Sequence, residues 1–75
     1  MNLTTRNEAD DSAVLAASKQ VSDRLGLSLE EALRGVQYGV ELADKEARDA
    51  GDQERAERMV ELFESTIRVG RKLRT

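Results

Sequence analysis

The sequence predicts a small all-α domain, a three-helix bundle in which helices two and three form an antiparallel hairpin. Three observations lead to this prediction. Apolar residues recur at spacings of three and four, glycines interrupt that pattern at two places, and the 75 residues include no proline. No alternating apolar and polar run is long enough to indicate a strand. We expect a single helical domain over residues 1–75, with helices at about 7–25, 28–50 and 52–73 and a flexible segment at 1–6.

The first helix is expected to turn one apolar face toward the rest of the domain. Acidic residues, among them Asp10 and Asp11, precede that face. Negative charge near a helix N-terminus suits the helix dipole, and this is the role that the sequence indicates for both residues. The apolar face itself combines Val14, Ala17, Val21 and Leu25.

The stretch DRLGLSLEEALRG, residues 23–35, predicts a corner between the first and second helices. Gly26 suits the left-handed conformation that ends a helix, and Ser28 with Glu31 matches a capping box at the start of the next. The same stretch is similar to the turn of helix-turn-helix proteins, in which the second helix enters the major groove of DNA. Glu30 and Glu31 would then face a phosphate-lined groove, which is electrostatically unfavourable. We therefore interpret the stretch as a generic corner.

The second helix carries two parallel stripes, too wide for a single neighbouring helix. One is a heptad seam, and the other consists of small residues that include Gly35 and Gly39. Glycine inside a soluble helix is unfavourable by roughly 1 kcal/mol relative to alanine, so the two glycines suggest a close approach of another group. The predicted partner-binding residues are Gly35, Tyr38, Gly39, Leu42 and Ala43.

Gly51 and Asp52 are expected to end the second helix and begin the third. Because this connection is short, the two helices should be antiparallel neighbours. The third helix contains Phe63, the only phenylalanine, which we expect at the centre of the core, with the first helix packed nearby.

Several chemistries are disfavoured by composition. The chain has no cysteine, which excludes disulfides and thiolate chemistry, and no histidine, the most common general base. Acidic residues cluster around 44–54, but their spacing does not match a calcium loop. We expect no enzymatic activity, no catalytic or metal-binding residues and no cofactor. No stretch approaches the roughly 18 apolar residues of a membrane span, and we expect a cytoplasmic protein without membrane contact.

Charge is unevenly distributed along the chain. The net charge is −3, yet residues 66–75 contain four basic residues and no acid. These are Arg68, Arg71, Lys72 and Arg74, the possible contacts to nucleic acid. The competing interpretation, which we favour, is that cations near a helix C-terminus stabilise the helix dipole.

These features favour a non-enzymatic protein–protein interaction module, an adaptor, regulator or inhibitor, acting through the Gly/Ala-lined face of the second helix with the third helix alongside. Its partner would be another protein or a second copy, so that a homodimer is possible. One alternative is a small DNA-binding transcriptional regulator of helix-turn-helix-like type that uses the basic C-terminal tail. Another is an inhibitor of a nucleic-acid enzyme by acidic mimicry. Nucleic acid is the less expected partner, because two glutamates begin the second helix.

Overall fold

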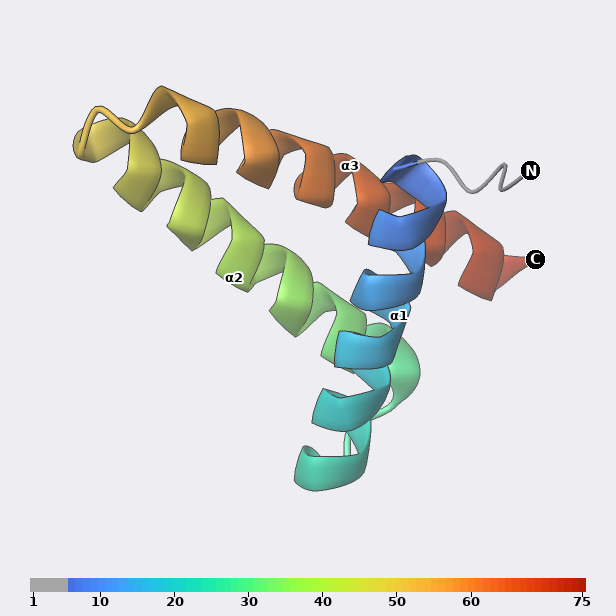
Figure 1. The fold of residues 1–75 in the computed structure, drawn as a ribbon. Coiled ribbons are helices and arrows are strands. Elements are labelled where there is room, and N and C mark those ends of the chain that lie inside the picture. Colours follow the sequence, from blue (N-terminus) through green and yellow to red (C-terminus); the bar gives the residue numbers. More distant parts are fainter. Residues whose placement is uncertain (1–5) are drawn as a thin grey trace.

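The computed structural model describes residues 6–75, and it shows a small all-α three-helix bundle (Figure 1). Helix α1 spans Arg6–Leu25, α2 spans Leu29–Asp49 and α3 spans Gln53–Arg74. These bounds differ by no more than one residue from those expected. Of the segment expected to be flexible, 1–5 lies outside the described residues, and Arg6 is the first residue of α1.

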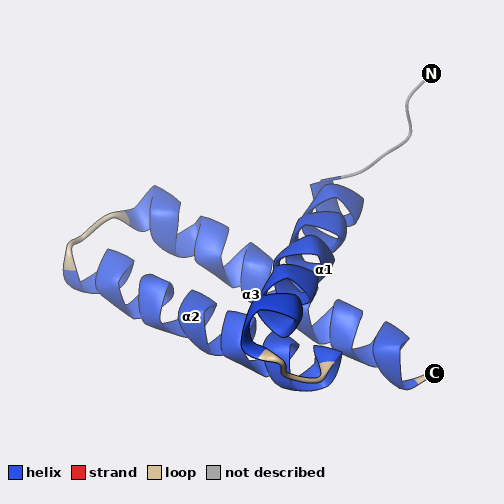
Figure 2. Ribbon diagram, turned by 90° about the horizontal axis from the view of Figure 1, so that it is seen from below, coloured by secondary structure: helices blue, strands red, loops and turns tan. Residues whose placement is uncertain are grey.

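The helices form two layers. Helices α2 and α3 make the predicted antiparallel hairpin, and α1 lies across its open end (Figures 1 and 2). The turn that joins α2 to α3 lies far from α1 in both views. The tip of the hairpin therefore extends beyond the part that α1 covers.

The corner between α1 and α2 has the predicted capping geometry. Gly26 adopts a left-handed backbone, with φ 68°, and its amide donates to the carbonyl of Ser22 at 2.9 Å. The Glu31 amide donates to the Ser28 hydroxyl at 3.1 Å, and the Ser28 amide donates to the Glu31 carboxylate at 2.9 Å. This reciprocal pair confirms the capping box.

The turn between α2 and α3 is built in the same way, with a glycine of positive φ that ends one helix and a side chain that caps the next. Gly51 has φ 74°, and the Gly51 and Asp52 amides donate back to the carbonyls of Arg48 and Ala47. This pair of bonds is a Schellman motif, which satisfies carbonyls that the end of α2 would leave unpaired. The Asp52 carboxylate then accepts from the amide of Arg55 at 3.1 Å and caps α3.

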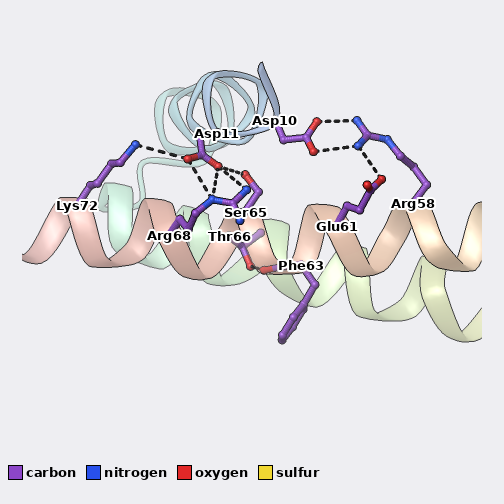
Figure 3. A network of polar contacts seen from close by, with 9 residues as sticks. All are labelled: Asp10, Asp11, Arg58, Glu61, Phe63, Ser65, Thr66, Arg68 and Lys72. Atoms are coloured by element: carbon purple, nitrogen blue, oxygen red, sulfur yellow. Dashed lines mark hydrogen bonds and ion pairs between the residues drawn. The ribbon is translucent and has the colours of Figure 1, made fainter. Parts of the chain in front are cut away.

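The core lies where all three helices meet, and it does not centre on Phe63. Val14, Leu33 and Val69, one residue from each helix, form the buried cluster. Phe63 is only half-buried, and its side chain points to the side of α3 away from α1 (Figure 3). The expectation of a phenylalanine at the centre is therefore wrong, because the only aromatic ring of α3 lies on the face that α1 does not cover.

Small side chains lie at the most tightly packed positions. Ser18 of α1, Ala32 of α2 and Ser65 of α3 are completely buried. The Ser18 hydroxyl donates to the carbonyl of Val14 at 2.9 Å, so its burial leaves no donor unpaired. Serine and alanine thus occupy three of the sites where the helices approach, and the buried Gly70 of α3 occupies another, where an added Cβ would lie 3.5 Å from the Leu33 side chain.

The result is an extended molecule with a thin core. Its radius of gyration is 13.1 Å, whereas a compact domain of this length would have about 11 Å. The longest and shortest dimensions are 37 and 20 Å. One side of the hairpin is consequently left without a second layer, which is unusual for a helical domain.

Candidate functional site

Four of the five predicted partner-binding residues share one exposed strip of α2. Gly35, Tyr38, Gly39 and Leu42 follow one another at helical spacings of three and one, and all four are exposed. The Tyr38 side chain is 62% exposed and that of Leu42 is 45% exposed. Ala43 is half-buried at the inner edge of this strip. We call these five residues the α2 strip.

The glycines of the α2 strip have no close neighbour in the described chain. A Cβ atom added to Gly35 or Gly39 would meet no atom within 4 Å outside its own helix backbone. The small-residue stripe is therefore not explained by packing within the bundle. The stripe also contains Ala32, which is buried, and Ala43, which is half-buried, whereas both glycines are exposed, so the stripe runs along the edge of the packed surface.

A partly buried ion pair joins the start of α1 to α3. Arg58 donates two hydrogen bonds to the carboxylate of Asp10, at 2.7 and 2.9 Å (Figure 3). Asp10 is only 3% exposed. Arg58 also contacts Glu61 at 3.4 Å, and Arg6 contacts the same glutamate at 3.5 Å. A bidentate arginine–carboxylate pair restricts both distance and orientation, so this contact sets where α1 crosses α3.

The neighbouring carboxylate, Asp11, collects three donors from α3. Ser65 donates to it at 2.6 Å, Arg68 at 3.1 Å and Lys72 at 3.4 Å (Figure 3). The donors lie at spacings of three and four residues and therefore share one side of α3. Asp10 and Asp11 together hold the N-terminal part of α1 against this side.

The pKa values of both aspartates reflect these partners. The pKa of Asp10 is lowered, mainly because its charged form accepts the hydrogen bonds from Arg58. Burial acts to raise the pKa of Asp11, but hydrogen bonds from Arg68 and Ser65 outweigh it, and the pKa of Asp11 also lies below its ordinary value. Both carboxylates are thus held in the charged form.

The predicted basic tail divides into two pairs with different surroundings. Arg68 and Lys72 point toward α1 and engage Asp11. Arg71 and Arg74 lie on another side of α3, where they line a hollow of about 280 Å³ together with Arg34 of α2. The four residues therefore do not form one continuous basic surface.

Sequence reasoning missed the ion pairs that join α1 to α3. Asp10 and Asp11 had an adequate local explanation as acids in the first turns of a helix. Their partners lie 48 residues away for Arg58 and 57 for Arg68, and helical periodicity carries no information about such pairings. One available signal was the position of Asp10, which lies four residues before Val14 on the apolar face of α1.

Other kinds of site have little support within residues 6–75. This part of the chain has no group of three or more acidic, histidine or cysteine side chains placed to hold a metal ion. The acidic residues around 44–54 instead include a pair between Arg48 and Asp44 at 3.0 Å. None of the three helices is long and apolar enough to cross a membrane.

Comparison with known proteins does not place the chain in a family. The sequence matches no protein-family model, and neither the curated proteins nor the solved structures give a significant match.

Proposed function

We propose that this protein is a non-enzymatic interaction module that binds a protein partner through the α2 strip. The observation that carries the proposal is the exposure of Tyr38 and Leu42 beside two glycines in the middle of one helix. Tyrosine is enriched among residues that dominate binding energy at protein interfaces. A partner helix or strand could approach the backbone closely at Gly35 and Gly39, because no side chain projects there.

The position of the strip supports this proposal. Its residues lie on a regular helix with both ends capped, so binding does not require the surface to become ordered first. Pre-organised surfaces lose less conformational entropy on binding than mobile loops do. The exposed apolar side chains of α3, Val60 and Ile67, belong to a different face of the molecule.

Site-specific photo-crosslinking in cells tests this proposal. A photoreactive phenylalanine analogue at position 38 should give a discrete crosslinked product, whereas the same analogue at the exposed Lys19 of α1 should not. The product at position 38 should disappear when Leu42→Glu is added, because a charge would then be placed in the apolar contact. Equal crosslinking at positions 38 and 19, or a product insensitive to Leu42→Glu, would contradict the proposal.

The glycines allow a second, sharper test. Gly39→Leu has room within the bundle and should leave the helical content unchanged. On a surface approached closely by a partner, the same side chain should abolish the crosslink from position 38. A crosslink of undiminished yield in Gly39→Leu would show that the glycines play no part in binding.

DNA binding is the alternative with a specific observation behind it, namely the three arginines that line one hollow. It predicts retardation of duplex DNA that weakens steeply with salt. Arg71→Glu should remove that binding, while Lys72→Glu should act mainly on the contact with Asp11. Acidic mimicry gains less support, since Asp10 and Asp11 face inward against arginines.

A further inference from the structure

The α2–α3 hairpin has apolar residues on both sides, and α1 covers only one of them. Asp10 and Asp11 hold α1 to the side of α3 that carries Arg58 and Ser65. Phe63 points to the opposite side (Figure 3). Along that opposite side, α2 and α3 border two hollows, of about 280 Å³ at the open end and about 180 Å³ toward the tip. We call this line of hollows the hairpin groove.

The middle of the hairpin groove is apolar and accessible. Ile67 is 39% exposed and Val60 is 38% exposed, and between them lies the half-buried Phe63. Val40 borders the same part of the groove from α2. A helix hairpin with apolar side chains on both sides is the arrangement found in layered helical bundles, where each side packs against further helices.

The two ends of the hairpin groove carry opposite charge. Arg34, Arg71 and Arg74 surround the open-end hollow, against a single acid, Glu30. Within residues 6–75 none of these three arginines forms an ion pair. The tip-end hollow is bordered by Glu41 and Asp44 and by no basic residue. Asp44 is paired with Arg48, whereas Glu41 forms no ion pair in the described chain.

When a second copy of the groove is turned end to end against the first, the basic end of each copy lies opposite the acidic end of the other. We propose that the hairpin groove binds a second copy of this chain, with the two hairpins stacked face to face and antiparallel. Arg34 and Glu41 are seven residues apart on α2, about 10 Å along the helix axis. A two-fold axis across the groove midway between them, near Gln37, places Arg34 of each copy opposite Glu41 of the other. Such an interface is isologous and closes as a dimer.

The size of the groove face suits a stable dimer. Helix α2 has 21 residues and is thus about 30 Å long, and two adjacent helices are about 20 Å wide. The face therefore offers roughly 600 Å² per copy, which corresponds to the lower end of stable protein interfaces, about 1,200 Å² in total. The hairpins of the two copies would form a two-layer four-helix bundle with one α1 on each outer side, and the α2 strip would lie outside the groove.

The dimer is tested by measuring molar mass with light scattering and sedimentation equilibrium over a range of concentrations. The expected mass at high concentration is twice the 8.3 kDa of the chain. Ile67→Glu should give a monomer with unchanged helical content, because it puts a charge into the apolar centre of the interface. A chain that stays monomeric at millimolar concentration would overturn the proposal.

A charge exchange tests the antiparallel arrangement. Arg34→Glu and Glu41→Arg should each weaken dimerisation by at least about tenfold, since a two-fold interface contains every altered contact twice. The variant carrying both substitutions should recover most of the loss, because it restores opposite charges in exchanged positions. Glu46→Arg, on another side of α2, is the matched control and should leave the dimer unchanged.

The outcomes separate this inference from the function proposed above. A dimer whose stability is unchanged by Ile67→Glu and by the charge exchange would use another face and would overturn the assignment of the groove. Crosslinking from Tyr38 in the Ile67→Glu variant, which lacks the groove dimer, reports on the α2 strip alone, because Tyr38 lies next to the two-fold axis near Gln37. Absence of that crosslinking, together with a groove dimer in the unaltered chain, would count against the interaction module alone.

Discussion

At the scale of single residues, the contacts that orient α1 are polar. Asp10 is nearly inaccessible and receives both hydrogen bonds from one guanidinium group. Removing one member of a buried charged pair leaves the other without a partner, and this loss is larger than the net contribution of the pair. The Arg58 side chain is 38% exposed and can partly regain water, so the loss is smaller than for a fully buried pair.

Asp10→Asn is accordingly expected to reduce the free energy of unfolding by about 2 kcal/mol, because a hydrogen bond to a charged group contributes about 1.5–3 kcal/mol. Urea unfolding followed by circular dichroism measures this change. Glu61→Gln is the matched control, since that carboxylate makes only long contacts of 3.4 and 3.5 Å and its side chain is 39% exposed, against 4% for Asp10. Its effect should stay below about 0.5 kcal/mol. Equal losses for both variants would contradict the role given to Asp10.

The lowered pKa values of Asp10 and Asp11 predict loss of stability in acid. A carboxylate whose pKa is depressed by folding contributes stability that is complete above its unfolded pKa, near 3.8. That contribution disappears as pH falls through the lower pKa of the folded state. Unfolding free energy should therefore decrease as the pH drops below about 4.

Urea unfolding at a series of pH values measures this dependence. The variant carrying Asp10→Asn and Asp11→Asn should start from a lower stability and show a smaller further decrease in acid. An acid dependence as steep as that of the unaltered chain would assign the effect to other carboxylates.

At the scale of helices, glycines at the two corners determine where α1 and α2 end. The middle of α2, by contrast, contains two glycines that lower its helix propensity. Gly26 and Gly51 adopt positive φ values that other residues adopt only with strain. Gly35 and Gly39 have ordinary helical backbone and no neighbours that would exclude a side chain. Glycine is thus required by backbone geometry at the two corners, whereas in α2 its presence calls for an explanation outside the bundle.

Two substitutions of glycine by alanine are expected to change the free energy of unfolding in opposite directions. Gly39→Ala should raise the free energy of unfolding by up to about 1 kcal/mol, because alanine favours the helix and its Cβ meets nothing. Gly51→Ala should lower it by about 1 kcal/mol, because its φ of 74° is strained for alanine. Thermal unfolding of both variants at the same low concentration checks this pair. A destabilising Gly39→Ala would reveal a close contact at that position.

At the scale of the whole molecule, one face of the hairpin is buried and the other is accessible. The buried apolar cluster is small, and α1 supplies only Val14 to its fully buried part. Phe63, the side chain with the largest apolar area in α3, contributes instead to the hairpin groove. The bundle consequently depends on few core residues, and the ring of Phe63 is available for contact with another chain.

The difference between the buried and the accessible face predicts that truncating Val14 and truncating Phe63 affect stability differently. Val14→Ala should reduce stability by about 2 kcal/mol at every protein concentration, because it removes methyl groups from the core. Phe63→Ala should reduce stability in dilute solution by less than the 3–5 kcal/mol typical of a buried phenylalanine. Its effect should grow with protein concentration if the second copy covers this ring, since only the bound state is affected. Unfolding curves at two concentrations distinguish the variants. A large loss of unfolding free energy for Phe63→Ala that does not depend on concentration would show that this residue belongs to the core.

The sequence by itself determined the three helices, their ends and the antiparallel hairpin. These features follow from local physics: helical periodicity, the Ser28–Glu31 capping box, and glycines at the two corners. It also indicated which residues of α2 to examine as an interaction surface, and the structure shows that Tyr38 and Leu42 are accessible there.

Only the tertiary structure decided which side of α3 meets α1. That choice placed Arg68 and Lys72 against Asp11, left Arg71 and Arg74 beside Arg34, and turned Phe63 away from the core. The physical reason is that both sides of the hairpin are apolar, so hydrophobic patterning alone does not distinguish them. The distinction comes from ion pairs between residues far apart in the sequence, which depend on how α1 crosses α3 and have no periodic signature.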